Sequence, residues 1–136
     1  MKDKAFFDTN MLMYLYSNDD DIKKAACRET LKNFIPIIST QVINELCNIF
    51  TKKLKLPATD IARAISKVTS FFHVETVDLH VISYALKLYS KFGYSYFDCL
   101  MLSSAILSGC KHIITEDMQD EHNVDGVIIN NIFRGL

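Results

Sequence analysis

The stretch Ala5-Phe6-Phe7-Asp8-Thr9-Asn10 decides how this chain folds, because it joins a short apolar run to an acidic, polar end. A short apolar run that stops at turn-forming residues is typical of a buried strand. The mostly apolar residues from Met11 to Tyr16 follow directly and predict a short helix. The stretch is therefore interpreted as a strand that leads into a helix, with Asp8 where the two meet.

The same alternation of strand and helix continues along the chain. Further strands are predicted at residues 35–38, 73–77, 112–115 and 127–129, and a polar turn runs from the fourth strand to Gly126. Further helices are predicted from Asp20 or Asp21 to about Phe34, from Thr40 to Leu54, from Thr59 or Asp60 to about Phe72, from Asp78 to Gly93 and from Ser95 to Gly109. This order predicts an α/β fold with a central, mostly parallel, twisted sheet covered by helices on both faces. With 136 residues, we expect one domain over residues 1–136.

Composition narrows the class of protein. Hydrophobic residues make up 49% of the chain and charged residues 23%, which indicates a globular domain rather than a disordered one. The apolar runs are too short to cross a membrane, and the first residues lack the apolar core of a secretory signal, so we expect a cytoplasmic protein. The four cysteines form no C-x-x-C pair and are interpreted as reduced, packed thiols. A net charge of −1 gives no overall basic field for nucleic acid, so attraction to a polyanion would be local or carried by a metal.

Two acidic residues follow apolar strands directly. Asp8 ends the first strand, and Asp117 follows the strand at residues 112–115. The carboxyl ends of parallel strands are where sheets of this class gather ligand-binding groups. A helix cap at Asp8 and ordinary turn bonding at Asp117 are the simpler alternatives.

Asp98 and Glu45 lie on predicted helices. Asp98 fits a capping box that starts at Ser95, but the helix after it is apolar almost all round and should be mostly buried. Burying a carboxylate is costly unless it is paired or bound to a metal, which favours a functional role for Asp98. Glu45 borders the apolar stripe of its helix and, taken alone, would be a solvated glutamate.

Four carboxylates gathered in one pocket would repel one another. At an effective dielectric constant of about 20, each pair ~5 Å apart costs on the order of 3 kcal/mol. Such a pocket calls for divalent cations, and all-oxygen ligands favour Mg²⁺ or Mn²⁺ over zinc.

With these residues in this order, the sequence resembles the PIN-domain ribonucleases, and most closely the VapC toxins of bacterial toxin–antitoxin pairs. The matching segments, which span nearly the whole chain, are residues 7–10, 39–46, 96–101 and 115–120, followed by a short strand and Asn130. The resemblance implies a PIN-like α/β fold in which Asp8, Glu45, Asp98 and Asp117 are the catalytic, metal-binding acids. The chain departs from the family pattern at Asp120-Glu121, where relatives often have glycine.

The resemblance also implies an activity and its partners. It implies a Mg²⁺-dependent endoribonuclease toxin, with Mn²⁺ as a substitute, that acts on a transfer RNA or a ribosomal RNA loop. It implies inhibition by a VapB-like antitoxin and a homodimer. Asn10 and Thr115 are candidates for orienting ligands or water, with ordinary capping or turn bonding as the alternative. Glu116 is a weaker candidate for a ligand, and the basic stretches around Lys23 and Lys52 are more simply solvated helix faces.

Two other functions are compatible with an α/β fold. A non-catalytic PIN-like module that binds RNA or protein would lack turnover. A receiver-type phosphoacceptor domain would need adjacent acids after the first strand and a lysine after a late strand. Asp8 stands alone, and residues 115–120 contain no lysine, so the receiver alternative is disfavoured.

Overall fold

The computed structural model describes all residues, 1–136. Twelve elements follow one another: β1 (Lys4–Phe7), α1 (Thr9–Tyr16), α2 (Asp21–Leu31), β2 (Ile35–Ser39), α3 (Thr40–Lys52), α4 (Ala58–Phe71), β3 (His73–Glu75), α5 (Leu79–Phe92), α6 (Tyr96–Leu107), β4 (His112–Ile114), β5 (Asn123–Val124) and β6 (Val127–Asn130). The predicted alternation of strands and helices is confirmed.

The six strands form one sheet in the order β3-β2-β1-β4-β6-β5. Every neighbouring pair is parallel except β5 with β6. The chain builds outward from β1 through β2 to β3 and then returns to the other side of β1 with β4. The order in which the chain adds strands therefore reverses between β1 and β4. In open α/β sheets, ligands bind at such a point, outside the carboxyl ends of the strands.

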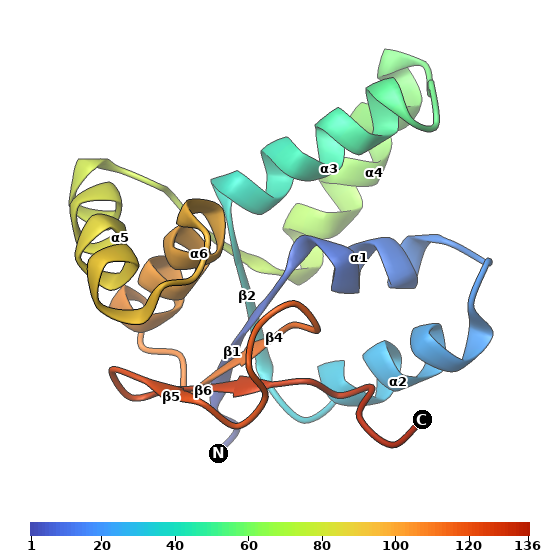
Figure 1. Cartoon of the computed structure of the whole chain (residues 1–136). Coiled ribbons are helices and arrows are strands. Elements are labelled where there is room, and N and C mark those ends of the chain that lie inside the picture. The colour runs from blue at the N-terminus through green and yellow to red at the C-terminus, as the bar shows by residue number, and fades with distance from the viewer.

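Helices cover both faces of the sheet. Figure 1 shows α1 and α2 on one side and α5 and α6 on the other, while α3 and α4 form a hairpin that extends beyond the carboxyl ends of the strands. Helix α6 packs against the sheet, and its residues from Cys99 to Ala105 are all buried, as their apolar character predicts. None of the helices is long and apolar enough to cross a membrane.

The structure corrects the sequence interpretation at several element ends. Strand β3 stops at Glu75 rather than at residue 77, and helix α3 stops at Lys52 rather than at Leu54. Helix α2 ends at Leu31 rather than at about Phe34, because backbone bonds from Lys32 and Asn33 close a tighter turn there. Part of the expected polar turn is strand β5, which pairs antiparallel with β6. Asp125 and Gly126 join these strands with φ of 48° and 98°, and an Asp-Gly pair in this conformation is a common hairpin turn.

At Asp120-Glu121, where the sequence departs from the glycine of the family pattern, the backbone adopts an unusual conformation. Glu121 adopts a φ of 67°, in the left-handed region that favours glycine. Its backbone N–H donates to the carbonyl of Ile129 at 2.8 Å, which ties the loop to β6. This chain thus keeps a left-handed position in the loop without using glycine for it.

Candidate active site

Asp8 lies at the carboxyl end of β1, beside the end of β4. Its backbone N–H donates to the carbonyl of Ile114 at 3.1 Å, and its Oδ2 accepts a hydrogen bond from Thr115 Oγ1 at 2.7 Å. The residue is only 4% exposed. Although Asp8 occupies the position before α1, its side chain makes no capping hydrogen bond. The carboxylate is thus held by the neighbouring strand rather than by the helix that it precedes.

Glu45 projects from α3 and is held at both oxygens. The hydroxyl of Thr9 donates to Oε1, and Nε2 of Gln41 donates to Oε2 at 3.1 Å. Gln41 is only 8% exposed, and its Nε2 also donates to the carbonyl of Phe97 at 3.1 Å. Since Phe97 precedes Asp98, Gln41 links Glu45 to the start of α6, where the next acidic residue lies.

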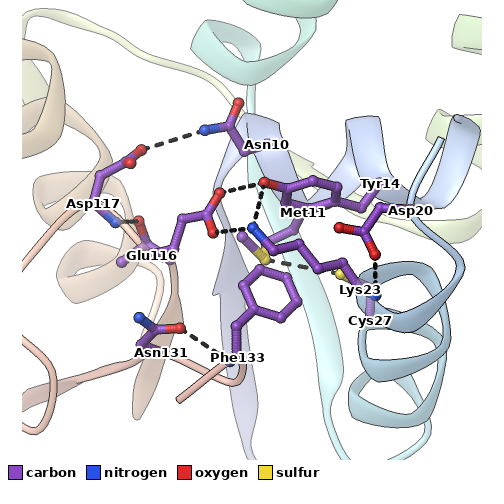
Figure 2. A network of polar contacts seen from close by, with 11 residues as sticks. Asn10, Met11, Tyr14, Asp20, Lys23, Cys27, Glu116, Asp117, Asn131 and Phe133 are labelled. Carbon is purple, nitrogen blue, oxygen red and sulfur yellow. Dashed lines mark hydrogen bonds and ion pairs between the residues drawn. The ribbon is translucent and has the colours of Figure 1, made fainter. Parts of the chain in front are cut away.

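Asp98 and Asp117 complete the group of acids predicted from the sequence. The N–H of Asp98 donates to Ser95 Oγ at 3.2 Å, which forms one half of a capping box and leaves the half-buried carboxylate without a capping role. Asp117 is exposed, and its N–H donates to Thr115 Oγ1 at 3.2 Å. Figure 2 shows its side chain directed toward Asn10, whose Nδ2 donates to Oδ2 at 3.4 Å.

The negative charges of neighbouring acids act on Asp8 and on Asp98. The pKa of Asp8 is raised from 3.8 to about 6, first by burial and then by the negative charges of the other three acids, against the lowering effect of the Thr115 hydrogen bond. The pKa of Asp98 is also raised, first by burial and then by the charges of Asp117 and Glu45. None of the four acids forms an ion pair with a lysine, arginine or histidine. The chain therefore gathers four carboxylates, here called the acid group, without a protein cation to compensate them.

The acid group fits a divalent cation in charge and in donor type. Its ligands would all be carboxylate oxygens, which hard cations such as Mg²⁺ prefer. In this arrangement, no three acidic, histidine or cysteine side chains lie close enough together to hold a metal ion. Their oxygens instead accept hydrogen bonds from neutral groups of Thr9, Gln41, Thr115 and Asn10. Coordination thus requires the carboxylates to move closer to a common point, and they can keep these hydrogen bonds as they do so, because a carboxylate has about four lone-pair sites on its two oxygens.

Glu116 lies outside the acid group. Lys23 Nζ forms an ion pair with its Oε2 at 3.0 Å, and Tyr14 donates a hydrogen bond to its Oε1 (Figure 2). The same ammonium lies 4.8 Å from the ring centroid of Tyr14 and 4.9 Å from that of Phe133. The charge of Glu116 is not among those that raise the pKa of Asp8. Lys23, expected on a solvated helix face, is instead partly buried and paired.

Sequence reasoning missed four residues around these carboxylates: Thr9, Tyr14, Lys23 and Gln41. Two of them carried a local signal, since Thr9 adjoins Asp8 and Gln41 lies four residues before Glu45, on the same face of the helix. The contact of Tyr14 and Lys23 with Glu116 had no such signal, because these residues are 102 and 93 positions away from it.

Replacing Gln41 by leucine should weaken divalent metal binding. The substitution keeps the size of the side chain but removes the donor to Glu45 and to the carbonyl of Phe97. Groups that orient a ligand typically contribute about 10–100-fold to metal affinity, so we expect a loss of that size for Mn²⁺ in titration calorimetry. Asn48→Leu, an exposed change on the same helix, is the matched control. Equal affinities of Gln41→Leu and wild type would show that Gln41 does not position Glu45.

The chain is similar to known proteins in family and in fold. The chain matches the PIN domain family over residues 5–122. Similar solved structures include a toxin–antitoxin complex from Klebsiella pneumoniae, with a TM-score of 0.71 and 20% identity over 92% of this chain and 96% of that one. They also include VapBC2 from Rickettsia felis bound to a promoter DNA fragment, with a TM-score of 0.68 and 17% identity over 93% and 97%. A third is VapC20 from Mycobacterium tuberculosis, a sarcin-ricin loop cleaving toxin, with a TM-score of 0.64 and 15% identity over 81% and 87%. No curated protein matches the chain.

Proposed function

Since this chain belongs to the PIN-domain family, we propose that it is a metal-dependent endoribonuclease and the toxin of a VapBC-type toxin–antitoxin pair. Asp8, Glu45, Asp98 and Asp117 are the catalytic, metal-binding residues of this proposal. The proposed PIN domain comprises residues 1–136.

One observation carries the proposal. Four carboxylates come from four separate parts of the chain, and the charges of Glu45 and Asp117 raise the pKa of both Asp8 and Asp98. No lysine, arginine or histidine pairs with any of the four. An uncompensated group of this kind is costly to maintain for stability alone, because like charges and burial both disfavour ionised carboxylates. A divalent cation offsets that cost, and this requirement supports a catalytic rather than a structural role.

The proposed reaction is hydrolysis of an RNA phosphodiester bond, which leaves 5′-phosphate and 3′-hydroxyl ends. A divalent ion, when bound, lowers the pKa of a water molecule and offsets negative charge on the phosphate. Thr115 keeps Asp8 in place through its hydroxyl, and Thr9 and Gln41 keep Glu45 in place. Asn10 plays the same role for Asp117. We propose Mg²⁺ as the ion, with Mn²⁺ as a substitute, because all ligands would be carboxylate oxygens.

The proposed partners follow from the family and from similar structures. The structures from Klebsiella pneumoniae and Rickettsia felis are toxin–antitoxin complexes, which supports a VapB-like antitoxin as inhibitor. The Mycobacterium tuberculosis toxin cleaves the sarcin-ricin loop, which makes a ribosomal RNA loop, besides transfer RNA, a substrate to test. We further propose a homodimer that acts in the cytoplasm.

Incubation of the purified protein with transfer RNAs and ribosomal RNA loop fragments tests this proposal. We expect discrete cleavage with Mg²⁺ or Mn²⁺, loss of cleavage with EDTA, and recovery when Mn²⁺ is added in excess. Sequencing of the cleaved ends should place the cut in an unpaired loop. Binding of these RNAs without cleavage under any metal would contradict the proposal and would favour the non-catalytic binding module.

A further inference from the structure

A pocket of about 440 Å³ lies beside the acid group, between the beginnings of α3 and α6. Glu45 forms part of its wall, so the pocket begins at one of the proposed catalytic carboxylates. Phe97, Leu100 and Val77 contribute its apolar surface, and Asn44 lies on its α3 side. We refer to it below as the Phe97 pocket.

Phe97 is an exposed aromatic residue in a fixed position. It is 61% exposed, and it directly precedes Asp98. Its carbonyl accepts a hydrogen bond from Gln41, and its ring meets that of Tyr96 edge-on with 5.4 Å between centroids. An exposed aromatic ring on a rigid backbone can serve as a surface on which a base stacks, and single-stranded RNA is commonly bound in this way.

The polar groups of the pocket leave two side chains with an unpaired atom, namely the buried Oε1 of Gln41 and the exposed amide of Asn44. Thr40 Oγ1 accepts a hydrogen bond from the N–H of Val77 at 3.0 Å, and both oxygens of Glu45 are occupied as described above. Nε2 of Gln41 is shared between Glu45 and Phe97. Asn44 is exposed, so its amide, which can both donate and accept, is the polar group that a ligand reaches from solvent.

The charge of the pocket determines which part of an RNA it fits. No lysine or arginine lines it, and the carboxylate of Glu45 repels phosphate. Its apolar surface and the exposed amide of Asn44 instead suit a flat, uncharged group with hydrogen-bonding edges. A nucleobase has this chemistry, because it stacks through its faces and pairs with amides at its edges.

We propose that the Phe97 pocket binds a nucleobase next to the scissile phosphate of a single-stranded RNA, by stacking on Phe97 and hydrogen bonding to Asn44. This inference rests on the proposed function, because it places the base relative to a cleaved bond. It assigns substrate selection in part to α3 and α6, the same two helices that carry Glu45 and Asp98.

Replacement of Phe97 by alanine, combined with abasic substrates, tests the proposal. Loss of one stacked base typically costs about 10–100-fold, so we expect kcat/KM of Phe97→Ala on a cleavable oligonucleotide to fall by that factor. An abasic site at the nucleotide in the pocket should lower kcat/KM of the wild type to a similar extent. The two losses should not add, since both remove the same contact. Phe97→Trp should retain the wild-type rate, and Asn44→Leu should reduce discrimination among bases at that nucleotide.

Control measurements separate stacking from other roles of the residue. Phe71→Ala, which removes a 58% exposed ring from the end of α4, should leave kcat/KM unchanged. Phe97→Ala should bind Mn²⁺ and elute in size-exclusion chromatography as the wild type does. The proposal is overturned if Phe97→Ala keeps the wild-type kcat/KM, or if its loss adds to that of an abasic site at every position. A changed oligomeric state that accounts for the loss would also overturn it and assign Phe97 to a contact between copies.

Failure of the proposed function gives a different result. If the wild type binds single-stranded RNA without cutting it, the proposed nuclease activity is contradicted. The proposal for the Phe97 pocket is then tested by measuring the affinity for RNA. In that case Phe97→Ala must weaken binding of intact RNA about 10–100-fold but leave binding of the abasic RNA unchanged. Equal affinities of Phe97→Ala and the wild type for intact RNA would overturn the proposed base binding in the pocket as well.

Discussion

Asp8→Asn should abolish RNA cleavage, with a loss of more than about 100-fold in the single-turnover rate at saturating Mg²⁺. Groups that only orient a ligand already contribute about 10–100-fold, and Asp8 is proposed to hold the ion directly. The asparagine side chain has the same shape and can still accept the hydrogen bond from Thr115, so the fold should persist. Asp98→Asn should behave in the same way. The measurement is single-turnover cleavage of the RNA that the wild type cuts, with circular dichroism as the check on folding.

Asp3→Asn provides the matched control for this loss. Asp3 is exposed and lies just before β1, so its replacement removes the same charge from the chain without touching the acid group. We expect its cleavage rate to equal that of the wild type. Cleavage by Asp8→Asn at the wild-type rate would show that Asp8 does not hold the ion.

The same Asp8→Asn variant should be more stable than the wild type in the absence of metal, by about 3 kcal/mol near neutral pH. Burial, the first cause, and the charges of the other acids raise the pKa of Asp8 from 3.8 to about 6. Ionised Asp8 therefore destabilises the folded state relative to the unfolded chain. Asparagine carries no charge at any of these pH values and avoids this cost.

The pH dependence of this difference has a definite sign. Below about pH 4, Asp8 is protonated in both states and the cost is absent. Between about pH 4 and pH 6 the unfolded chain gives up the proton first, so the stability of the metal-free wild type falls as pH rises. Above about pH 6 the cost is complete. Urea denaturation with EDTA across this range should show a gap between variant and wild type that widens with pH. A constant gap, or a variant that is less stable near neutral pH, would contradict the prediction.

Divalent cation should close the stability gap between Asp8→Asn and the wild type near neutral pH, because an ion that binds only the folded wild type stabilises it by mass action.

The protein itself supplies no cation to the acid group. Lys23 is held by Glu116, Tyr14 and Phe133, and its charge does not contribute to the pKa of Asp8. The position of this ion pair thus accounts for an acid group that stays uncompensated although a lysine lies on the neighbouring helix α2.

Much of the fold was determined by local sequence pattern. The short apolar runs and the apolar stripes between them follow the periods of strands and helices, and those periods depend only on the local backbone. The same pattern placed Asp8 at the end of a strand and predicted a mostly buried helix after Asp98. The Asp-Gly pair at residues 125 and 126 is also a local turn signal, although the two-residue strand before it is too short to show the alternation of side chains that marks a strand.

Only the tertiary structure decided what surrounds each carboxylate. The order β2-β1-β4 brings Thr115 to Asp8 across 107 positions of chain, and the approach of α1 to α3 brings Thr9 to Glu45 across 36. It also decided that Glu116 pairs with Lys23, whereas Asp117, the next residue, points toward Asn10. Adjacent acids look alike in a sequence, because local periodicity specifies which face a side chain takes but not which distant residue it meets. That choice is made by the packing of whole elements.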